Sequence, residues 1–169
     1  TEVIGESGSI APQKTPTEAQ PWTDFAGYFA LLEKQGISVN LVSYVGLGTA
    51  RELIIGNDNR PPTAAELTAM QDLVTASMQQ GAAGVSTGLI YPPNAFATLD
   101  ELVALSMPAA ALGGRYASHL RHDGKKLRDG GMAPMPALFL AMDQVLDTQT
   151  AQLAIPRRFT TDMKERWAL

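Results

Sequence analysis

The stretch that decides the fold is residues 63–87, TAAELTAMQDLVTASMQQGAAGVST. Thr63 and Glu66 have the spacing of a capping box, in which each side chain binds the free backbone N–H of the other residue. Apolar residues then recur at helical spacing: Leu67, Met70, Val74 and Met78. Two glycines mark the exit, and residues 83–87 are typical of a short buried strand. This stretch therefore predicts a helix joined through glycine to a strand.

Residues 24–45 follow the same plan. Thr23 can cap a helix over residues 24–35, and Gly36 is suited to the left-handed conformation in which many helices end. Residues 37–45 are rich in β-branched and aromatic side chains, which predicts a strand.

A third copy lies further along the chain. Thr98 and Glu101 again have capping-box spacing, two glycines follow the helix, and residues 115–119 predict a strand. Pro108 interrupts the pattern, because proline removes a helical hydrogen bond and clashes with the preceding turn. We therefore expect this helix to bend or stop near Met107.

Helices that alternate with strands predict an α/β fold of parallel strands joined by right-handed connections. Two architectures fit the spacing, an open doubly wound sheet and part of a (β/α)₈ barrel, and both place function at the carboxyl ends of the strands. The chain has 169 residues, whereas a complete barrel needs about 250. The regular pattern ends at Gly124, which divides the chain into residues 1–124 and a divergent segment, 125–169, expected to be helical or poorly ordered.

Composition argues against several classes of function. The net charge is −4 and the pI is near 5.1, which predicts neither a nucleic-acid partner nor an anionic membrane surface. No apolar run approaches the ~20 residues of a membrane span, and the first residues lack a secretory signal, so the cytoplasm is the default compartment.

The chain has no cysteine, which removes thiolate metal ligands and a cysteine nucleophile. The basic side chains near the carboxyl end predict a solvated tail: Arg157, Arg158, Lys164 and Arg166.

Candidate binding residues follow the first two expected strands. After the first, a glycine-rich segment leads to Arg51, which can bind a carboxylate through two hydrogen bonds or be an exposed arginine on a tight turn. This segment is not a dinucleotide fingerprint, since it lacks the full glycine spacing and a helix directly after it. After the second strand, the loop 86–93 carries hydroxyls, Tyr91 and two prolines. It predicts either the apolar wall of a substrate pocket or a simple connector.

Both histidines of the chain, His119 and His122, follow the third expected strand, with Arg121 between them. Neutral imidazole is the commonest metal ligand among side chains, and residues at the carboxyl end of a barrel strand face the site. The alternative is a histidine that is hydrogen-bonded in the core. The position at a strand end makes His119 a candidate metal ligand.

Three stretches carry a resemblance to a known family and span about residues 22–124: WTDFAGYFALLEKQGISVNLVSYVGLGTAR, GAAGVSTGLIYPPNAFATLDELVAL and GGRYASHLRHDG. They resemble the N-acyl-D-amino-acid deacylases (D-aminoacylases) of the amidohydrolase superfamily, and the opening TEVIGESGSIAP also fits. The resemblance implies a partial, incomplete TIM-like (β/α) barrel from a zinc-dependent hydrolase. Members cleave the amide of an N-acyl-D-amino acid to a carboxylate and a free D-amino acid. A zinc-activated hydroxide attacks the carbonyl that the metal polarises.

The resemblance also assigns residues. It implies that His119 is a metal ligand in the SHLR motif, that Tyr91 lies beside the substrate pocket, and that Arg121 shapes the site. With Arg51, the expected substrate-binding residues are Tyr91, Arg51 and Arg121, and the expected partner is a small N-acyl amino acid.

The sequence departs from the family pattern in its metal ligands. It lacks the His-x-His pair expected near the amino terminus, the metal-bridging cysteine, and a later histidine and catalytic aspartate in a matching motif. One histidine cannot hold a catalytic zinc, which takes about three protein ligands. We therefore expect an interior fragment of a deacylase, from a truncated or frameshifted gene, that neither binds zinc tightly nor deacylates alone. The alternative is a non-catalytic α/β binding or relic module that keeps the barrel scaffold.

Overall fold

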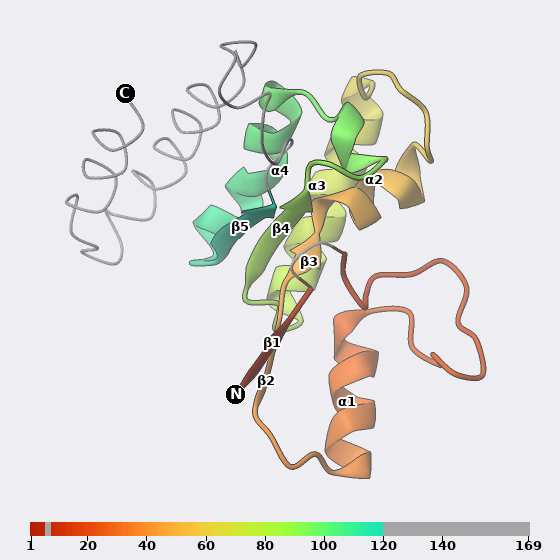
Figure 1. Ribbon diagram of the computed structural model, residues 1–169, viewed down its shortest axis with the longest axis vertical. Helices are drawn as coiled ribbons and strands as arrows, with labels where there is room; N and C mark the ends of the chain where they lie inside the picture. Colours follow the sequence, from red (N-terminus) through yellow and green to blue (C-terminus); the bar gives the residue numbers. More distant parts are fainter. Residues whose placement is uncertain (6–7, 120–169) are drawn as a thin grey trace, which may run out of the picture.

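The computed structural model describes residues 1–5 and 8–119, in which parallel strands pack against helices (Figure 1). One sheet has the order β3-β4-β5, and the other pairs β1 with β2. Each of these pairings is parallel. The strands are β1 (Glu2–Ile4), β2 (Leu41–Ser43), β3 (Val45–Gly46), β4 (Gly84–Gly88) and β5 (Arg115–His119). The parallel α/β fold expected from the sequence is confirmed.

Helices connect the strands in chain order: α1 (Phe25–Gln35), α2 (Leu47–Ile54), α3 (Ala64–Gln79), the short 3₁₀ helix η1 (Asn94–Phe96) and α4 (Leu99–Ala111). Figure 1 shows α3 and α4 beside the strands β4 and β5. Apolar side chains from the helices and from the sheet form one core cluster, which includes Phe25, Leu47, Met70, Val74, Val85, Leu105 and Ala109. The hydrophobic effect of this burial holds the helices on the sheet.

The capping box predicted at the start of α3 is present. The Thr63 hydroxyl accepts a hydrogen bond from the Glu66 backbone N–H at 3.3 Å, and the Glu66 carboxylate accepts one from the Thr63 N–H at 2.7 Å. At α4, Thr98 likewise accepts from the Glu101 N–H at 3.2 Å. The Glu101 carboxylate itself is bound elsewhere, as described below.

The start of α1 differs from the prediction by one residue. Asp24 is the cap, because its Oδ1 accepts a hydrogen bond from the Gly27 N–H at 2.9 Å, whereas Thr23 was expected. The end agrees with the prediction: Gly36 has a φ of 76°, and its N–H donates to the Leu32 carbonyl at 2.9 Å.

The strand predicted over residues 37–45 is shorter and is divided between the two sheets. Ile37 and Val39 are 47% and 44% exposed, and pairing begins only at Leu41, where β1 lies alongside. Beyond Tyr44, the chain pairs with β4 instead of β1. β-Branched residues therefore predicted a strand where the described part of the chain provides no partner strand.

Residues after β3 form a helix, which corrects the expectation of a loop without a helix directly after it. Gly46 is the N-cap of α2, and Arg51 lies on that helix. Gly48 packs against the side chain of Asn94, and a β-carbon at this position would collide with the Asn94 amide. The glycines here serve close packing within the protein.

We expected the helix with Pro108 to bend or stop near Met107. It does not stop there and continues to Ala111. Proline at position 108 cannot donate to the Ala104 carbonyl, four residues earlier. The side chain of Gln71, on α3, donates to that carbonyl at 2.9 Å. A neighbouring helix thus supplies the hydrogen bond that proline removes.

The contact between Gln71 and Ala104 predicts a coupling that can be measured. Gln71→Leu should lower the free energy of unfolding by about 1 kcal/mol, because it leaves a partly buried carbonyl without a donor. In a Pro108→Ala background, the new N–H can bind Ala104, and the same substitution should cost less. Urea unfolding of the four proteins in this double-mutant cycle measures the coupling. Equal costs in both backgrounds would show that Gln71 does not compensate for the proline.

Candidate functional site

The candidate site lies at the carboxyl ends of β4 and β5. His119 is the last residue of β5 and is opposite Gly88 in the sheet register. The chain turns after β4, and the Tyr91 N–H donates to the Gly88 carbonyl at 2.9 Å. The turn brings the ring centroids of Tyr91 and His119 to 5.9 Å. Of the residues predicted from sequence, these two are the pair that the structure brings together, and Tyr91 is 55% exposed.

The imidazole of His119 is on the face of the sheet opposite the hydrophobic core. Val85 belongs to the core cluster, and Tyr116, opposite it in register, packs against that cluster. Successive strand residues alternate between faces, so Ser118 shares the core face with Tyr116 and His119 does not. On the face that carries His119, Ser86 is also buried, and its hydroxyl donates to the Gly5 carbonyl. The strand register therefore does not direct the His119 side chain into the hydrophobic core, which was the alternative left open by the sequence.

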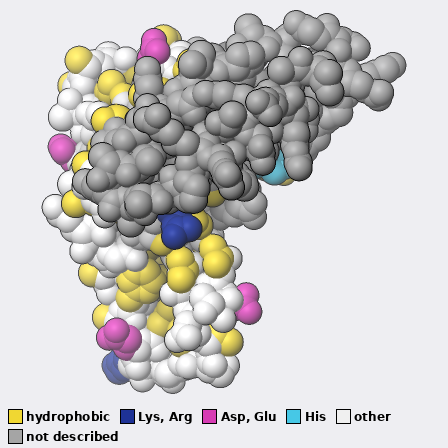
Figure 2. Space-filling model, turned by 90° about the vertical axis from the view of Figure 1, so that its left-hand side faces the viewer, with side chains coloured by type: hydrophobic (Ala, Val, Ile, Leu, Met, Phe, Trp, Pro, Cys, Tyr) yellow, Lys and Arg dark blue, Asp and Glu magenta, His cyan; other side chains and the backbone are white. Residues whose placement is uncertain are grey.

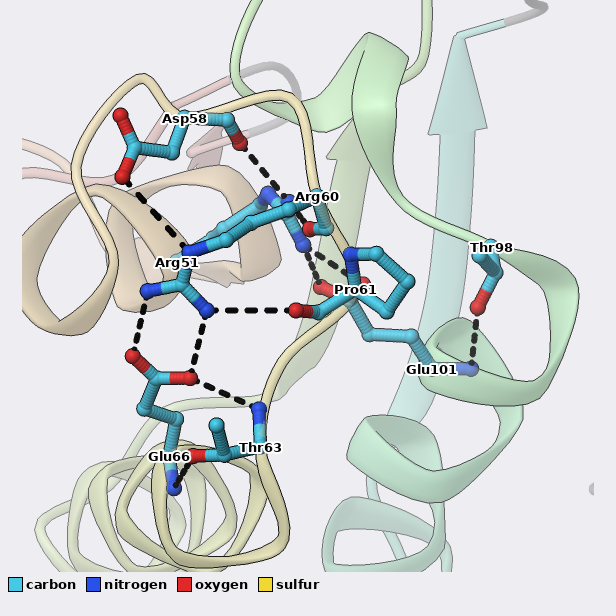
Figure 3. Close-up of polar contacts among 8 residues, drawn as sticks. All are labelled: Arg51, Asp58, Arg60, Pro61, Thr63, Glu66, Thr98 and Glu101. Carbon is cyan, nitrogen blue, oxygen red and sulfur yellow. Dashed lines mark hydrogen bonds and ion pairs between the residues drawn. The ribbon is translucent and has the colours of Figure 1, made fainter.

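The side chain of Arg51 is directed into the protein and is bound by Glu101 (Figure 3). Its Nη1 lies 2.6 Å from both carboxylate oxygens, and each side chain is 1% exposed. The Nη2 donates to the backbone carbonyls of Asp58 and Arg60 at 3.2 and 2.6 Å. We had expected Arg51 to bind a substrate carboxylate. It binds a carboxylate of its own chain, and its burial leaves no room for a substrate there.

Glu101 is the partner that the sequence reasoning missed. A signal was available, since Glu101 is four residues before Leu105, a core residue, on the same face of α4. A carboxylate on the buried face of a helix indicates a buried cationic partner. Asn94 is a second buried polar residue that the sequence did not single out. It is 4% exposed, and its side chain packs against Gly48 of α2.

A second ion pair joins the α2–α3 connection to the start of α3. Arg60 donates to both carboxylate oxygens of Glu66, at 2.8 and 2.6 Å (Figure 3). The hydrogen bonds from Arg60 and Thr63 hold the pKa of the Glu66 carboxyl well below its usual range. The same contact with Glu66 raises the pKa of Arg60.

A hollow of about 300 Å³ lies on another part of the surface, where the segment after β1 meets α2. It is lined by Ser9, Ile10, Pro12, Gln13, Lys14, Gln20, Thr49, Glu52 and Leu53. Tyr91 and His119 do not line it. Large apolar side chains are also exposed, among them Val3 (59%), Leu112 (49%) and Ile37 (47%). Figure 2 shows hydrophobic side chains on the surface of one face.

The described residues do not fit a complete metal centre. Within residues 1–5 and 8–119, no three His, Cys, Asp or Glu side chains are close enough to hold an ion. His119, the metal ligand predicted from the sequence, is among the described residues. Arg121 and His122 lie outside them. None of the helices described is long and apolar enough to cross a membrane.

Parallel strands, connecting helices and a histidine at a strand's carboxyl end define an α/β protein of the kind that places its site at the strand ends. Comparisons with known proteins agree. The chain is 39% identical over 103 residues to the D-aminoacylase of Alcaligenes xylosoxydans xylosoxydans, which is 61% of this chain and 21% of that protein. It is 36% identical over 128 residues to the N-acyl-D-glutamate deacylase of the same organism, 71% of this chain and 26% of that protein.

Solved structures give the same relationship. A crystal structure of D-aminoacylase, described as defining a novel subset of amidohydrolases, matches 85% of this chain and 32% of its own with a TM-score of 0.73 and 28% identity. N-acyl-D-glutamate deacylase from Bordetella bronchiseptica, complexed with zinc and a phosphonate inhibitor, matches 88% of this chain and 31% of its own with a TM-score of 0.67 and 32% identity. The chain is therefore homologous to the N-acyl-D-amino-acid deacylases of the amidohydrolase superfamily.

Two further findings bear on the extent of the similarity. The matched part of the chain spans between about a fifth and a third of the length of these relatives. Residues 130–169, outside the described residues, match a different family model, described as the Polymerase A arginine-rich C-terminus.

The buried ion pair predicts a strong and asymmetric effect of substitution. Arg51→Met should lower the free energy of unfolding by about 3–5 kcal/mol, since it leaves the Glu101 charge buried without a partner. The double variant Arg51→Met, Glu101→Leu should recover much of the loss. Denaturant unfolding followed by circular dichroism measures both. A double variant no more stable than the single one would mean that packing, and not the charge, dominates.

The lowered pKa of Glu66 predicts how stability depends on pH. A carboxyl with a lowered folded-state pKa stabilises the protein above its unfolded-state pKa, and this contribution is lost as the pH falls through the folded-state value. Glu66→Gln should therefore lower the thermal midpoint at pH 7, and the gap to wild type should narrow below about pH 4. Thermal unfolding between pH 7 and pH 2 measures the gap. Glu52→Gln, at an exposed position of α2, is the matched control, and a gap independent of pH would contradict the prediction.

Proposed function

We propose that this chain is part of a metal-dependent amidohydrolase that cleaves N-acyl-D-amino acids to a carboxylate and a free D-amino acid. The observation that carries the proposal is the position of His119. It ends a parallel strand, its imidazole is on the face away from the core, and Tyr91 lies beside it with ring centroids 5.9 Å apart. The homology to D-aminoacylase supports the substrate class.

In this proposal His119 is one ligand of a metal centre in a TIM-like (β/α) barrel, and Tyr91 lines the substrate pocket. Arg121 shapes the same site, since it follows β5 two residues after His119. The buried Arg51 stabilises the scaffold. We assign no catalytic step to a metal, because the described residues supply too few ligands for one.

We further propose that the 169 residues alone are inactive. The protein should bind far less than one zinc per chain in equilibrium dialysis at micromolar zinc, because His119 belongs to no cluster of three ligands among the described residues. It should release no D-amino acid from N-acyl-D-amino acids. The His119→Ala variant is the control. A zinc stoichiometry near one in wild type, lost in His119→Ala, would contradict the proposed inactivity and identify the ligand at once.

The second candidate is a non-catalytic α/β binding or relic module that keeps the scaffold. We propose that the chain has two parts, residues 1–124 and 125–169, and the different family match over residues 130–169 supports this division. Sequencing the source DNA through both ends of the reading frame and around codon 125 separates the candidates. A His-x-His upstream, and a further histidine and aspartate downstream, would favour the deacylase. Clean start and stop codons would favour the module.

A further inference from the structure

A row of hydroxyl groups crosses from β5 to β4 and back behind the candidate site. The Thr87 hydroxyl donates to Ser118 Oγ at 2.8 Å, and Ser118 Oγ donates to the backbone carbonyl of His119 at 3.0 Å. The Tyr116 hydroxyl also lies 2.8 Å from Thr87 Oγ1. Thr87 is fully buried. The three side chains are on the core face of the sheet, behind the imidazole of His119.

The direction of these hydrogen bonds follows from counting protons. Each hydroxyl has one proton to donate. Ser118 gives its proton to His119, and Thr87 gives its proton to Ser118, so Tyr116 must donate to Thr87. The row therefore runs in one direction, from Tyr116 to the carbonyl of His119, and hydrogen bonds in such a row strengthen one another.

The row acts at the end of the β4–β5 ladder, where the hydrogen bond is long. The Leu89 N–H is 3.4 Å from the His119 carbonyl, longer than the usual 2.9–3.0 Å. The Ser118 hydroxyl adds a second donor to the same oxygen. Because this carbonyl and the imidazole belong to one residue, holding the carbonyl fixes the backbone from which the imidazole projects.

We propose that Thr87, Ser118 and Tyr116 are positioning residues, which act through the backbone of His119 to fix its imidazole beside Tyr91. The value of this arrangement for a metal site rests on the proposed function. The positioning itself does not, because it is a property of hydrogen bonds within residues 87–119. None of the three hydroxyls is assigned a contact with substrate or metal.

The test uses nuclear magnetic resonance of the whole chain. Thr87→Val keeps the β-branched shape and removes the hydroxyl. It should make amide exchange at Leu89 about fivefold faster, the factor that corresponds to one net hydrogen bond, and weaken the nuclear Overhauser contact between the Tyr91 and His119 rings. Thr87→Ser, which keeps the hydroxyl, should restore both. Thr75→Val is the matched control, since that hydroxyl binds the Gln71 carbonyl of its own helix at 2.8 Å.

Each outcome decides the proposal. Wild-type exchange and ring contact in Thr87→Val would overturn it, as would Thr87→Ser behaving like Thr87→Val, because keeping the hydroxyl would then not be enough to hold the arrangement. If Thr87→Val does not fold, Ser118→Ala removes only the last donor, and faster Leu89 exchange would support the proposal while an unchanged rate would overturn it. These measurements need no metal, so their failure is distinguishable from a failure of the zinc and DNA tests of the proposed function.

Discussion

The buried ion pair between Arg51 and Glu101 is the constraint on which the helical layer depends. It joins α2 to the first turn of α4, and the same guanidinium holds the α2–α3 connection through the carbonyls of Asp58 and Arg60. Burying both charges is costly unless they are hydrogen-bonded, and both Nη atoms of Arg51 donate at 2.6–3.2 Å, whereas its Nε has no partner among the described residues. The loop that carries Tyr91 lies between β4 and α4. Fixing the start of α4 therefore also restricts the candidate site.

The two faces of the β3-β4-β5 sheet have different roles. Val85 and Tyr116 contribute to the core, and Ser86 and His119 are on the other face. This separation is a consequence of parallel pairing in one register, since a shift by one residue would exchange the faces. A hydroxyl row on the core face can thus support a histidine on the opposite face without occupying the space in which a ligand would bind.

Local signals predicted much of this fold. The capping pattern correctly predicted that helices start at Thr63 and Thr98. The glycine pattern correctly predicted the strand over residues 115–119. The same reasoning failed where distant residues intervene. The residues after β3 form a helix in which Gly48 packs on Asn94, and α4 continues past Pro108, where Gln71 supplies the missing donor.

The sequence by itself determined the element starts, the glycine exits and the candidacy of His119 and Tyr91, because each depends on residues within a few positions of one another. Only the tertiary structure decided which carboxylate Arg51 binds. Glu101 is 50 positions away along the chain, and Gln71 is 33 positions from the carbonyl that it satisfies. Such partners are selected by burial, since a charge or a carbonyl removed from water must find whichever partner the packing brings to it. That choice is made in three dimensions and leaves little local pattern in the chain.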